Sequence, residues 1–260
     1  LAVYLRPIAH NAPHRPPLRQ YEQGRVMGGG SAINAQIYTR GNPQDYDDWR
    51  QMGCTGWGYD DVLPYFKKAE DNETYENAFH GKGGPLGVSE PRAPLPICEA
   101  YFEAAAALGI PRNPDINSET QDGVCYYQLT QRNVRRSSAA MAYVTPNRGR
   151  PNLTVKLGAQ VRRLLVERGC ATGVEMMDGT RLMADREVLL CSGAVGSPRL
   201  LQLSGLGPAD HLSQLGIDVV ISQQEESARG GCGSPADVLQ SRLCNQLTLC
   251  HAPNLKPMSS

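Results

Sequence analysis

The residues that point most directly to chemistry are three consecutive glycines near the start of the chain. Gly28, Gly29 and Gly30 precede a mostly apolar run that extends to Tyr38. Consecutive glycines remove side chains, so a ligand can lie directly against backbone N–H groups. A helix that begins just beyond them adds partial positive charge for a phosphate or an electron-rich ring. A glycine triplet alone is more typical of a tight turn, so the residues around it decide the interpretation.

Histidine and cysteine, the other residue types that often carry chemistry, are scattered. No His, Cys and Asp cluster has the spacing of metal ligands, and we predict no metal site. We expect His80, in a glycine-rich loop, to be a surface or lid residue rather than a general base, and His211 to lie on the exposed side of a short helix. Arg162 and Arg163 are expected at a solvated strand end. Five cysteines occur singly and are predicted to be free buried thiols: Cys54, Cys98, Cys125, Cys170 and Cys191.

The overall charge argues against nucleic acid as a partner. Lys plus Arg and Asp plus Glu number 26 each, so no net field attracts the chain to a polyanion. No apolar run approaches the roughly 18 residues of a membrane-spanning helix, and the chain begins without a secretory signal pattern. We therefore expect no transmembrane segment, and a protein that is either cytoplasmic or bound peripherally to a membrane.

Two long segments make the glycine run specific. Residues 24–49 begin Gly-Arg-Val-Met-Gly-Gly-Gly-Ser-Ala-Ile-Asn-Ala-Gln-Ile-Tyr, and residues 193–208 read Gly-Ala-Val-Gly-Ser-Pro-Arg-Leu-Leu-Gln-Leu-Ser-Gly-Leu-Gly-Pro. In this order they resemble the two signature sequences of the glucose-methanol-choline (GMC) oxidoreductases, choline dehydrogenase-like or alcohol dehydrogenase-like members in particular. Between them, residues 80–86 are similar to the family's loop near the substrate entrance. The resemblance covers about residues 20–222.

The resemblance implies an α/β fold, α+β overall, in which an FAD/NAD(P)-binding domain carries an inserted cap or substrate domain. On this reading residues 1–45 and 151–222 are parts of the FAD-binding domain, and residues 46–150 belong to the cap. The family's Rossmann glycine motif does not precede the glycine run. We therefore expect a piece that is incomplete at both ends and, with sheet edges and apolar surface exposed, prone to aggregation.

The same resemblance implies FAD as the cofactor and assigns the residues that contact it. Members with covalently attached flavin have a His directly before the motif's Asn, and Ile33 stands there, so noncovalent FAD is expected. No catalytic residue is assigned, because the family's catalytic His and its partner belong to the C-terminal half. The residues expected at the cofactor are Val26, Gly28, Gly29, Gly30, Asn34, Ala35, Gln36, Ile37, Val161, Gly193 and Ala194.

The implied reaction is oxidation of a primary alcohol, choline-like or aliphatic, to the aldehyde by hydride transfer to flavin N5. The substrate is then a small alcohol, and the electron acceptor stays open. This chain is expected to be an incomplete and inactive piece of such an enzyme. Two alternatives remain: a non-catalytic remnant of the flavoprotein fold that binds no FAD, and a relative of the flavin-dependent hydroxynitrile lyases.

Residues 223–260 differ from the rest of the chain. They are polar and unpatterned at first and contain three cysteines, Cys232, Cys244 and Cys250. GC-rich codons for residues 229–237, read one base over, can encode a peptide close to the Pro-Gly-Val-Gly turn that relatives have here. We therefore expect an aberrant tail, frameshifted near residue 223 or disordered.

Periodicity and turn residues predict the elements between these motifs. Helical signals occur in residues 45–70, 98–108, 137–143, 197–203 and 210–215. Residues 77–96 are rich in Gly and Pro and are expected to be a loop with at most short strands. Strands are expected near residues 124–128, in a meander of 153–157, 161–167 and 171–176, in a buried strand at 188–191, and at 218–221.

Overall fold

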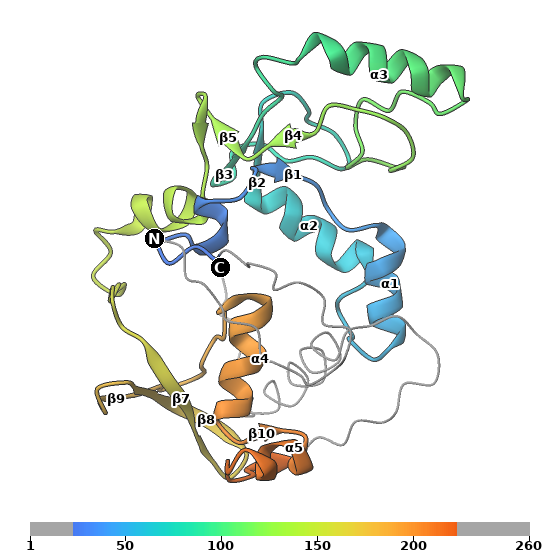
Figure 1. Cartoon of the computed structure of the whole chain (residues 1–260). Coiled ribbons are helices and arrows are strands. Elements are labelled where there is room, and N and C mark those ends of the chain that lie inside the picture. Colours follow the sequence, from blue (N-terminus) through green and yellow to red (C-terminus); the bar gives the residue numbers. More distant parts are fainter. Residues whose placement is uncertain (1–22, 223–260) are drawn as a thin grey trace, which may run out of the picture. The chain divides into compact units, whose positions relative to one another are not determined.

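The computed structural model describes residues 23–222 of the chain. The chain divides into two compact units, Leu1–Val155 and Lys156–Ser260, and each is described here by itself (Figure 1). The first 22 residues and the tail with its proposed frameshift lie outside the described residues. The assignment of residues 1–45 and 151–222 to one FAD-binding domain, with 46–150 as the cap, stays a prediction.

Two helices occupy the region where the first helical signals were expected. Helix α1 spans Pro43–Gln51 and α2 spans Tyr59–Ala69. The side chain of Asn42 accepts a hydrogen bond from the Gln44 N–H at 2.9 Å and so caps α1. Helix α2 has acidic residues in its first turn and lysines in its last, which suits the helix dipole. The glycines between Gln51 and Tyr59 separate the two helices. The helical signals in residues 45–70 did not predict this separation.

Short strands connect distant parts of the first unit. They are β1 (Ile37–Tyr38), β2 (Glu70–Asn72), β3 (Leu86–Val88), β4 (Gln128–Leu129), β5 (Gln131–Arg132) and β6 (Arg135–Arg136). Strand β1 pairs antiparallel with β4, β2 pairs parallel with β3, and β5 pairs antiparallel with β6. A bridge between Ser89 and Leu129 links the β2–β3 pair to β4. The prediction of at most short strands in residues 77–96 is confirmed.

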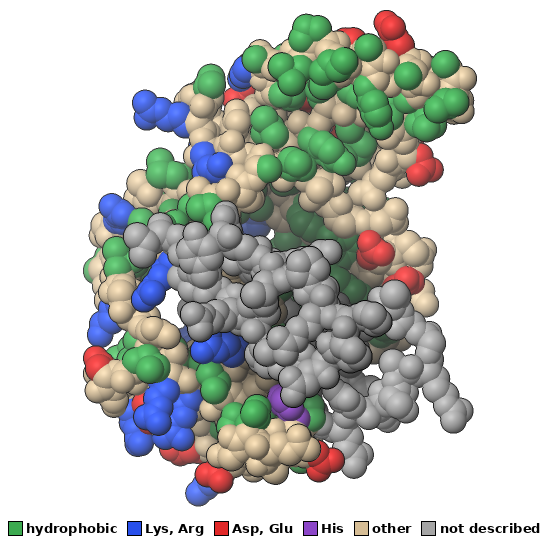
Figure 2. All heavy atoms as spheres, in the orientation of Figure 1, with side chains coloured by type: hydrophobic (Ala, Val, Ile, Leu, Met, Phe, Trp, Pro, Cys, Tyr) green, Lys and Arg blue, Asp and Glu red, His purple; other side chains and the backbone are tan. Residues whose placement is uncertain are grey.

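Helix α3 (Pro96–Ala107) confirms the helix predicted over residues 98–108. Phe102 and Ala105 on its inner side are buried, and Gly109 follows its C-terminus in a left-handed conformation. Apolar side chains gather over α3 in Figure 2. On and just after this helix, Tyr101 is 66% exposed and Leu108 is 80% exposed.

A π-helix at Ala140–Val144 and a 3-10 helix at Thr145–Asn147 replace the ordinary helix expected over residues 137–143. Pro146 lies within the 3-10 turn and cannot donate a backbone hydrogen bond, so a regular α-helix could not continue through it. Ala140 and Ala142 are buried. Their small side chains allow other backbone segments to approach closely.

The second unit combines a three-stranded antiparallel sheet with helix α4. The sheet order is β7 (Val161–Glu167), β8 (Cys170–Met176) and β9 (Arg181–Met183), and α4 spans Gly193–Leu203. Leu164, Leu201 and Leu206 form the buried core between them. The unit ends with β10 (Leu206–Gly207), α5 (Ala209–Gln214) and β11 (Ile221–Ser222), which pairs parallel with β10.

The strand expected near residues 124–128 is reduced to a bridge at Val124 and to β4, and two other predicted strands are absent. Residues 153–157 and 188–191 form no strand, and the third strand of the meander is β9 instead. Val188 and Leu190 pack against the core while Leu189 is 76% exposed. Side chains of residues 188–190 therefore do alternate between the core and solvent, but this segment forms no hydrogen-bonded ladder with any described strand.

The cysteines also differ from the prediction. Cys170 is disulfide-bonded. Cys54, Cys98, Cys125 and Cys191 are free thiols, as predicted, but none of these four is fully buried.

Candidate functional site

The glycine loop has one face against the protein and one open face. Gly28 adopts φ +94° and precedes the 3-10 turn Gly29–Ala32. A Cβ atom at Gly28 would lie 3.2 Å from both the Cβ and the backbone nitrogen of Ala140, whereas one at Gly29 or Gly30 would meet no atom within 4 Å. Gly29 and Gly30 therefore expose bare backbone to a ligand.

Apolar side chains on both sides of this turn are exposed. Val26 is 47%, Ile33 48% and Ile37 46% exposed. Exposed apolar side chains beside bare glycine backbone suit a flat, largely apolar ring system, because such a ring can pack on both. The residues present thus fit the isoalloxazine ring of FAD.

Two residues far along the chain hold the loop from the other side. The Ser31 hydroxyl donates to the Gly28 carbonyl at 2.5 Å and accepts from the Ala139 N–H at 2.9 Å. Arg136 Nη1 donates to the carbonyl and to the side-chain oxygen of Asn34, each at 2.7 Å, and to the Ser31 carbonyl at 3.2 Å. Arg136 is not among the residues predicted at the cofactor, and only its place in the sequence Arg135-Arg136-Ser137-Ser138 could have pointed to it.

The end of the loop is fixed by β1 and its neighbours. Gln36 has a positive φ of 65°, and its carbonyl accepts from the Thr130 N–H at 2.7 Å. Its side-chain amide donates to the Thr130 carbonyl at 3.5 Å and accepts from Gln131 Nε2 at 3.3 Å. Ala35 is exposed beside it.

The remaining residues predicted at the cofactor belong to the second unit. Val161 is the first residue of β7, and Gly193 and Ala194 begin α4. Gly193 has φ +82° and open space at its Cβ position. Eight of the eleven predicted residues thus lie on one continuous segment of the first unit, and a shared role with these three stays a prediction.

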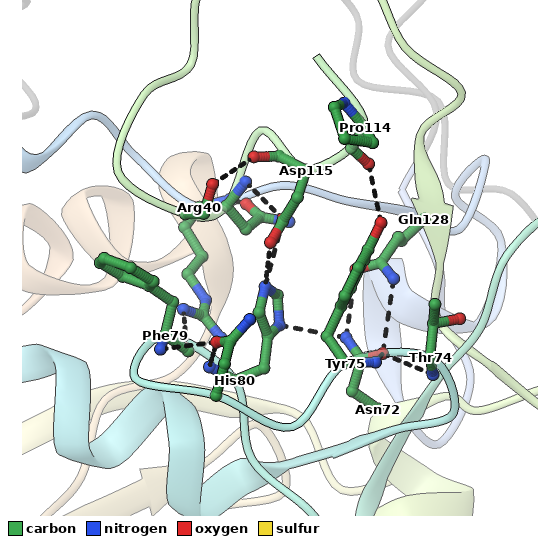
Figure 3. Close-up of polar contacts among 12 residues, drawn as sticks. Arg40, Asn72, Thr74, Tyr75, Phe79, His80, Pro114, Asp115 and Gln128 are labelled. Atoms are coloured by element: carbon green, nitrogen blue, oxygen red, sulfur yellow. Dashed lines mark hydrogen bonds and ion pairs between the residues drawn. The ribbon is translucent and has the colours of Figure 1, made fainter.

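A buried ionic cluster lies in the first unit (Figure 3). It consists of Arg40, Glu70, His80 and Asp115, and we call it the ionic cluster. Arg40 Nη2 lies 2.9 Å from Glu70 Oε2, Glu70 Oε1 lies 2.9 Å from His80 Nδ1, and His80 Nε2 lies 2.9 Å from Asp115 Oδ2. The side chains of Arg40, Glu70 and His80 are at most 2% exposed.

The prediction that His80 is a surface or lid residue is wrong. Its loop folds back against β2, and the ring becomes enclosed by Glu70 and Asp115. His211, in contrast, is exposed on α5 as predicted. Arg162 and Arg163 are 63% and 47% exposed and both pair with Glu175, in agreement with a solvated position.

The charges of the cluster stabilise one another. Burial alone would lower the pKa of His80, but its hydrogen bonds to Asp115 and Glu70 and their negative charges outweigh burial and raise the pKa to about 9. Burial would raise the pKa of Glu70, and the hydrogen bonds from His80, Asn72 and the Gly81 N–H overcome this effect and lower it. His80 is thus a protonated imidazolium at neutral pH, with both ring nitrogens occupied, and is unsuited to act as a general base.

Within residues 23–222, no group of three or more His, Cys, Asp or Glu side chains could hold a metal ion. No helix in this range is long and apolar enough to cross a membrane.

The sequence of this chain is similar to those of known flavin-dependent oxidoreductases. A family model described as GMC oxidoreductase matches residues 17–226. The chain is 41% identical over 204 residues to an oxygen-dependent choline dehydrogenase of Sinorhizobium fredii, covering 77% of this chain and 37% of that protein. It is 42% identical over 203 residues to the mitochondrial choline dehydrogenase of Mus musculus, with 77% and 34% coverage. The chain therefore spans little more than a third of the length of these curated relatives.

Solved structures agree with this match. The model resembles pyridoxine 4-oxidase from Mesorbium loti with a TM-score of 0.74 and 38% identity, covering 80% of this chain and 42% of that one. An FAD-dependent oxidoreductase from Chaetomium thermophilum gives a TM-score of 0.74 at 31% identity, with 79% and 38% coverage. The predicted α/β fold class of an FAD-binding domain is confirmed.

Proposed function

Since this chain belongs to the GMC oxidoreductase family, we propose that it supplies the flavin-facing loop of an FAD-dependent enzyme that oxidises a primary alcohol to an aldehyde. The observation that carries the proposal is the open backbone at Gly29 and Gly30, in a loop held by hydrogen bonds from Ala139 and Arg136. When bound, FAD would supply the redox chemistry by accepting a hydride at N5. The chain's own residues bind and orient the ring.

Each part of the loop has a distinct task in this proposal. Gly29 and Gly30 let the ring approach the backbone, Gly28 lets the loop pack closely against Ala140, and Val26 and Ile37 provide apolar contact. Asn34, oriented by Arg136, and Ala35 border the ring. The second unit would contribute the backbone of Val161 and the start of α4 at Gly193 and Ala194 to the same cofactor.

We propose that FAD is held without a covalent bond, because Ile33 occupies the position of the attaching His and its aliphatic side chain cannot form such a bond. Acid precipitation of the flavin-loaded protein should leave all yellow flavin in the supernatant. Flavin that stays with the pellet after repeated washing would contradict noncovalent binding.

The proposed substrate is a small primary alcohol, choline-like or aliphatic. The choline dehydrogenases among the relatives support the choline-like choice. The general base of the reaction is proposed to come from outside residues 23–222, since His80 has both ring nitrogens bonded to carboxylates, and the 260-residue chain alone is expected to turn over no alcohol.

The test is FAD binding to the whole chain, followed by flavin fluorescence. Gly30→Leu places a side chain in the open space that the proposal gives to the ring, and we expect a Kd raised at least about tenfold, equivalent to about 1.4 kcal/mol. Gly149→Leu is the matched control, because its Cβ position is also open but lies outside the loop. Equal affinities for both variants would contradict the proposal. No binding to the unmodified chain would favour the non-catalytic remnant instead.

A further inference from the structure

The ionic cluster has a charge pattern that requires a protonated histidine. Ionised Glu70 and Asp115 carboxylates only accept hydrogen bonds, so both nitrogens of His80 must donate. Asn72 Nδ2 also lies 3.1 Å from His80 Nδ1, but its two hydrogens are accounted for by Glu70 Oε1 at 2.9 Å and Gln128 Oε1 at 3.1 Å. Positive and negative groups then alternate from Arg40 to Asp115 with no net charge.

The cluster connects to the strand that follows the flavin-facing loop. Asp115 Oδ1 accepts from the Asn117 N–H at 3.1 Å. The side chain of Asn117 accepts from the Arg40 N–H at 2.8 Å and donates to the Tyr38 carbonyl at 3.2 Å. A continuous set of hydrogen bonds thus joins His80 to the backbone of residues 38–40.

Arg40 makes a second connection to the same strand. Its guanidinium donates to the Phe79 carbonyl at 2.7 Å and approaches the Tyr38 hydroxyl at 3.4 Å. Its carbonyl accepts from Gln121 Nε2 at 3.1 Å. The backbone at residues 38–40 is therefore held through the charged side chain of Arg40 on one path and through Asn117 on the other.

We propose that His80 and Asp115 are positioning residues, which clamp residues 38–40 through Asn117 and Arg40 and so fix the flavin-facing loop that precedes them. This inference rests on the proposed function only where it concerns the affinity for FAD. The clamp itself concerns the backbone of the chain alone.

Loss of the His80 charge weakens the clamp, because Asp115 then has no cationic partner within the cluster and a neutral imidazole donates to only one of the two carboxylates. The groups facing His80 are Glu70 from β2, Asp115 from the segment after α3, and Tyr75, whose ring centroid lies 5.2 Å away. Burial, with the charges of Glu90 and Asp115, raises the pKa of Tyr75 above 10. With its pKa raised to about 9, His80 is the group that loses its charge as the pH rises through that range.

The experiment is hydrogen exchange of the whole chain without FAD, read by mass spectrometry on peptides covering residues 34–41. His80→Gln and Asp115→Asn are compared with Glu99→Gln, which removes an exposed ion pair of the same unit with Arg112. We expect the first two variants to lower protection of residues 34–41 at least about tenfold, and Glu99→Gln to leave it unchanged. In the unmodified chain this protection should fall between pH 8 and 10, a step that His80→Gln should lack.

Flavin titration of the same variants separates the two claims. Lower protection together with a raised Kd for FAD supports the positioning role. The positioning role is overturned if protection of residues 34–41 is unchanged in Asp115→Asn, or if the unmodified chain shows no pH step. It is also overturned if protection falls while the affinity for FAD is unchanged. If the unmodified chain binds no FAD, the proposed function fails, and the exchange data still decide whether the clamp exists. Should His80→Gln not fold, the pH series on the unmodified chain gives the same decision.

Discussion

His80 couples the stability of the first unit to pH. Its ordinary pKa is 6.5, and in the folded chain it is raised to about 9 by Asp115 and Glu70 against the effect of burial. A folded-state pKa above the unfolded value means that the folded state binds the proton more tightly. The stabilisation is therefore complete below about pH 6.5 and is lost as the pH rises through about 9.

The protonation of His80 can be measured directly by NMR on histidine-labelled protein. We expect one imidazole to remain doubly protonated at pH 7.5 and to titrate near pH 9. The signal should disappear in His80→Gln and persist in Glu99→Gln. A His80 ring that is half deprotonated near pH 6.5 would contradict the cluster as described.

The glycine loop gives a second prediction for single residues. Gly28→Ala should lower the free energy of unfolding by about 1–3 kcal/mol, because φ is +94° and the new methyl group would press on Ala140. Gly30→Ala should change it by less than about 0.5 kcal/mol, since its Cβ position is open. Urea unfolding of both variants checks the difference, and equal losses would show that the loop does not lie against the π-helix.

At the scale of residues, the sequence pointed to residues that belong to a long continuous motif. It did not point to residues whose role depends on contacts with distant parts of the chain. Eight residues within the segment from Val26 to Ile37 were predicted at the cofactor because the motif is continuous, and their role there stays a prediction. Arg136 and the burial of His80 were missed because their partners are distant in sequence: Asn34 is 102 residues from Arg136, and Asp115 is 35 from His80. No spacing rule links such pairs before the fold is known.

At the scale of elements, α4 and the segment before it show which patterns predict structure. The helix at residues 197–203 was predicted, but its core face was not: Ser197 and Leu201, four residues apart, are its buried residues. In residues 188–191, the alternating pattern also matches the side chains that point toward the core and toward solvent. A strand, however, requires a neighbour, and the sequence of one segment does not contain that information.

Truncation of paired leucines tests this account of the second unit. Leu201→Ala should lower the free energy of unfolding by about 2–5 kcal/mol, because the side chain is 5% exposed and its removal leaves a cavity. Leu189→Ala, at 76% exposure, should cost less than about 0.5 kcal/mol. A large loss at Leu189 would mean that residues 188–191 form the buried strand that the structure lacks.

At the scale of the whole molecule, exposed apolar side chains should govern solubility. Tyr101, Leu108 and Ile97 on or beside α3 are 66%, 80% and 71% exposed, and such surfaces promote association. Tyr101→Lys together with Leu108→Lys should raise the soluble, monomeric fraction in light scattering. A matched change at two exposed polar sites, Glu103→Lys and Asp122→Lys, should not. A fully monomeric unmodified chain with a cooperative melt would contradict the prediction.

Photolabelling tests most directly whether the segment from Val26 to Ile37 faces the flavin ring. An FAD analogue with an azide on the isoalloxazine is bound to the whole chain, irradiated and mapped by mass spectrometry, with excess FAD as competitor. We predict labelling within residues 26–37 that FAD abolishes and that Gly30→Leu reduces while Gly149→Leu does not. Competed labelling confined to other segments, or none at all, would contradict the claim.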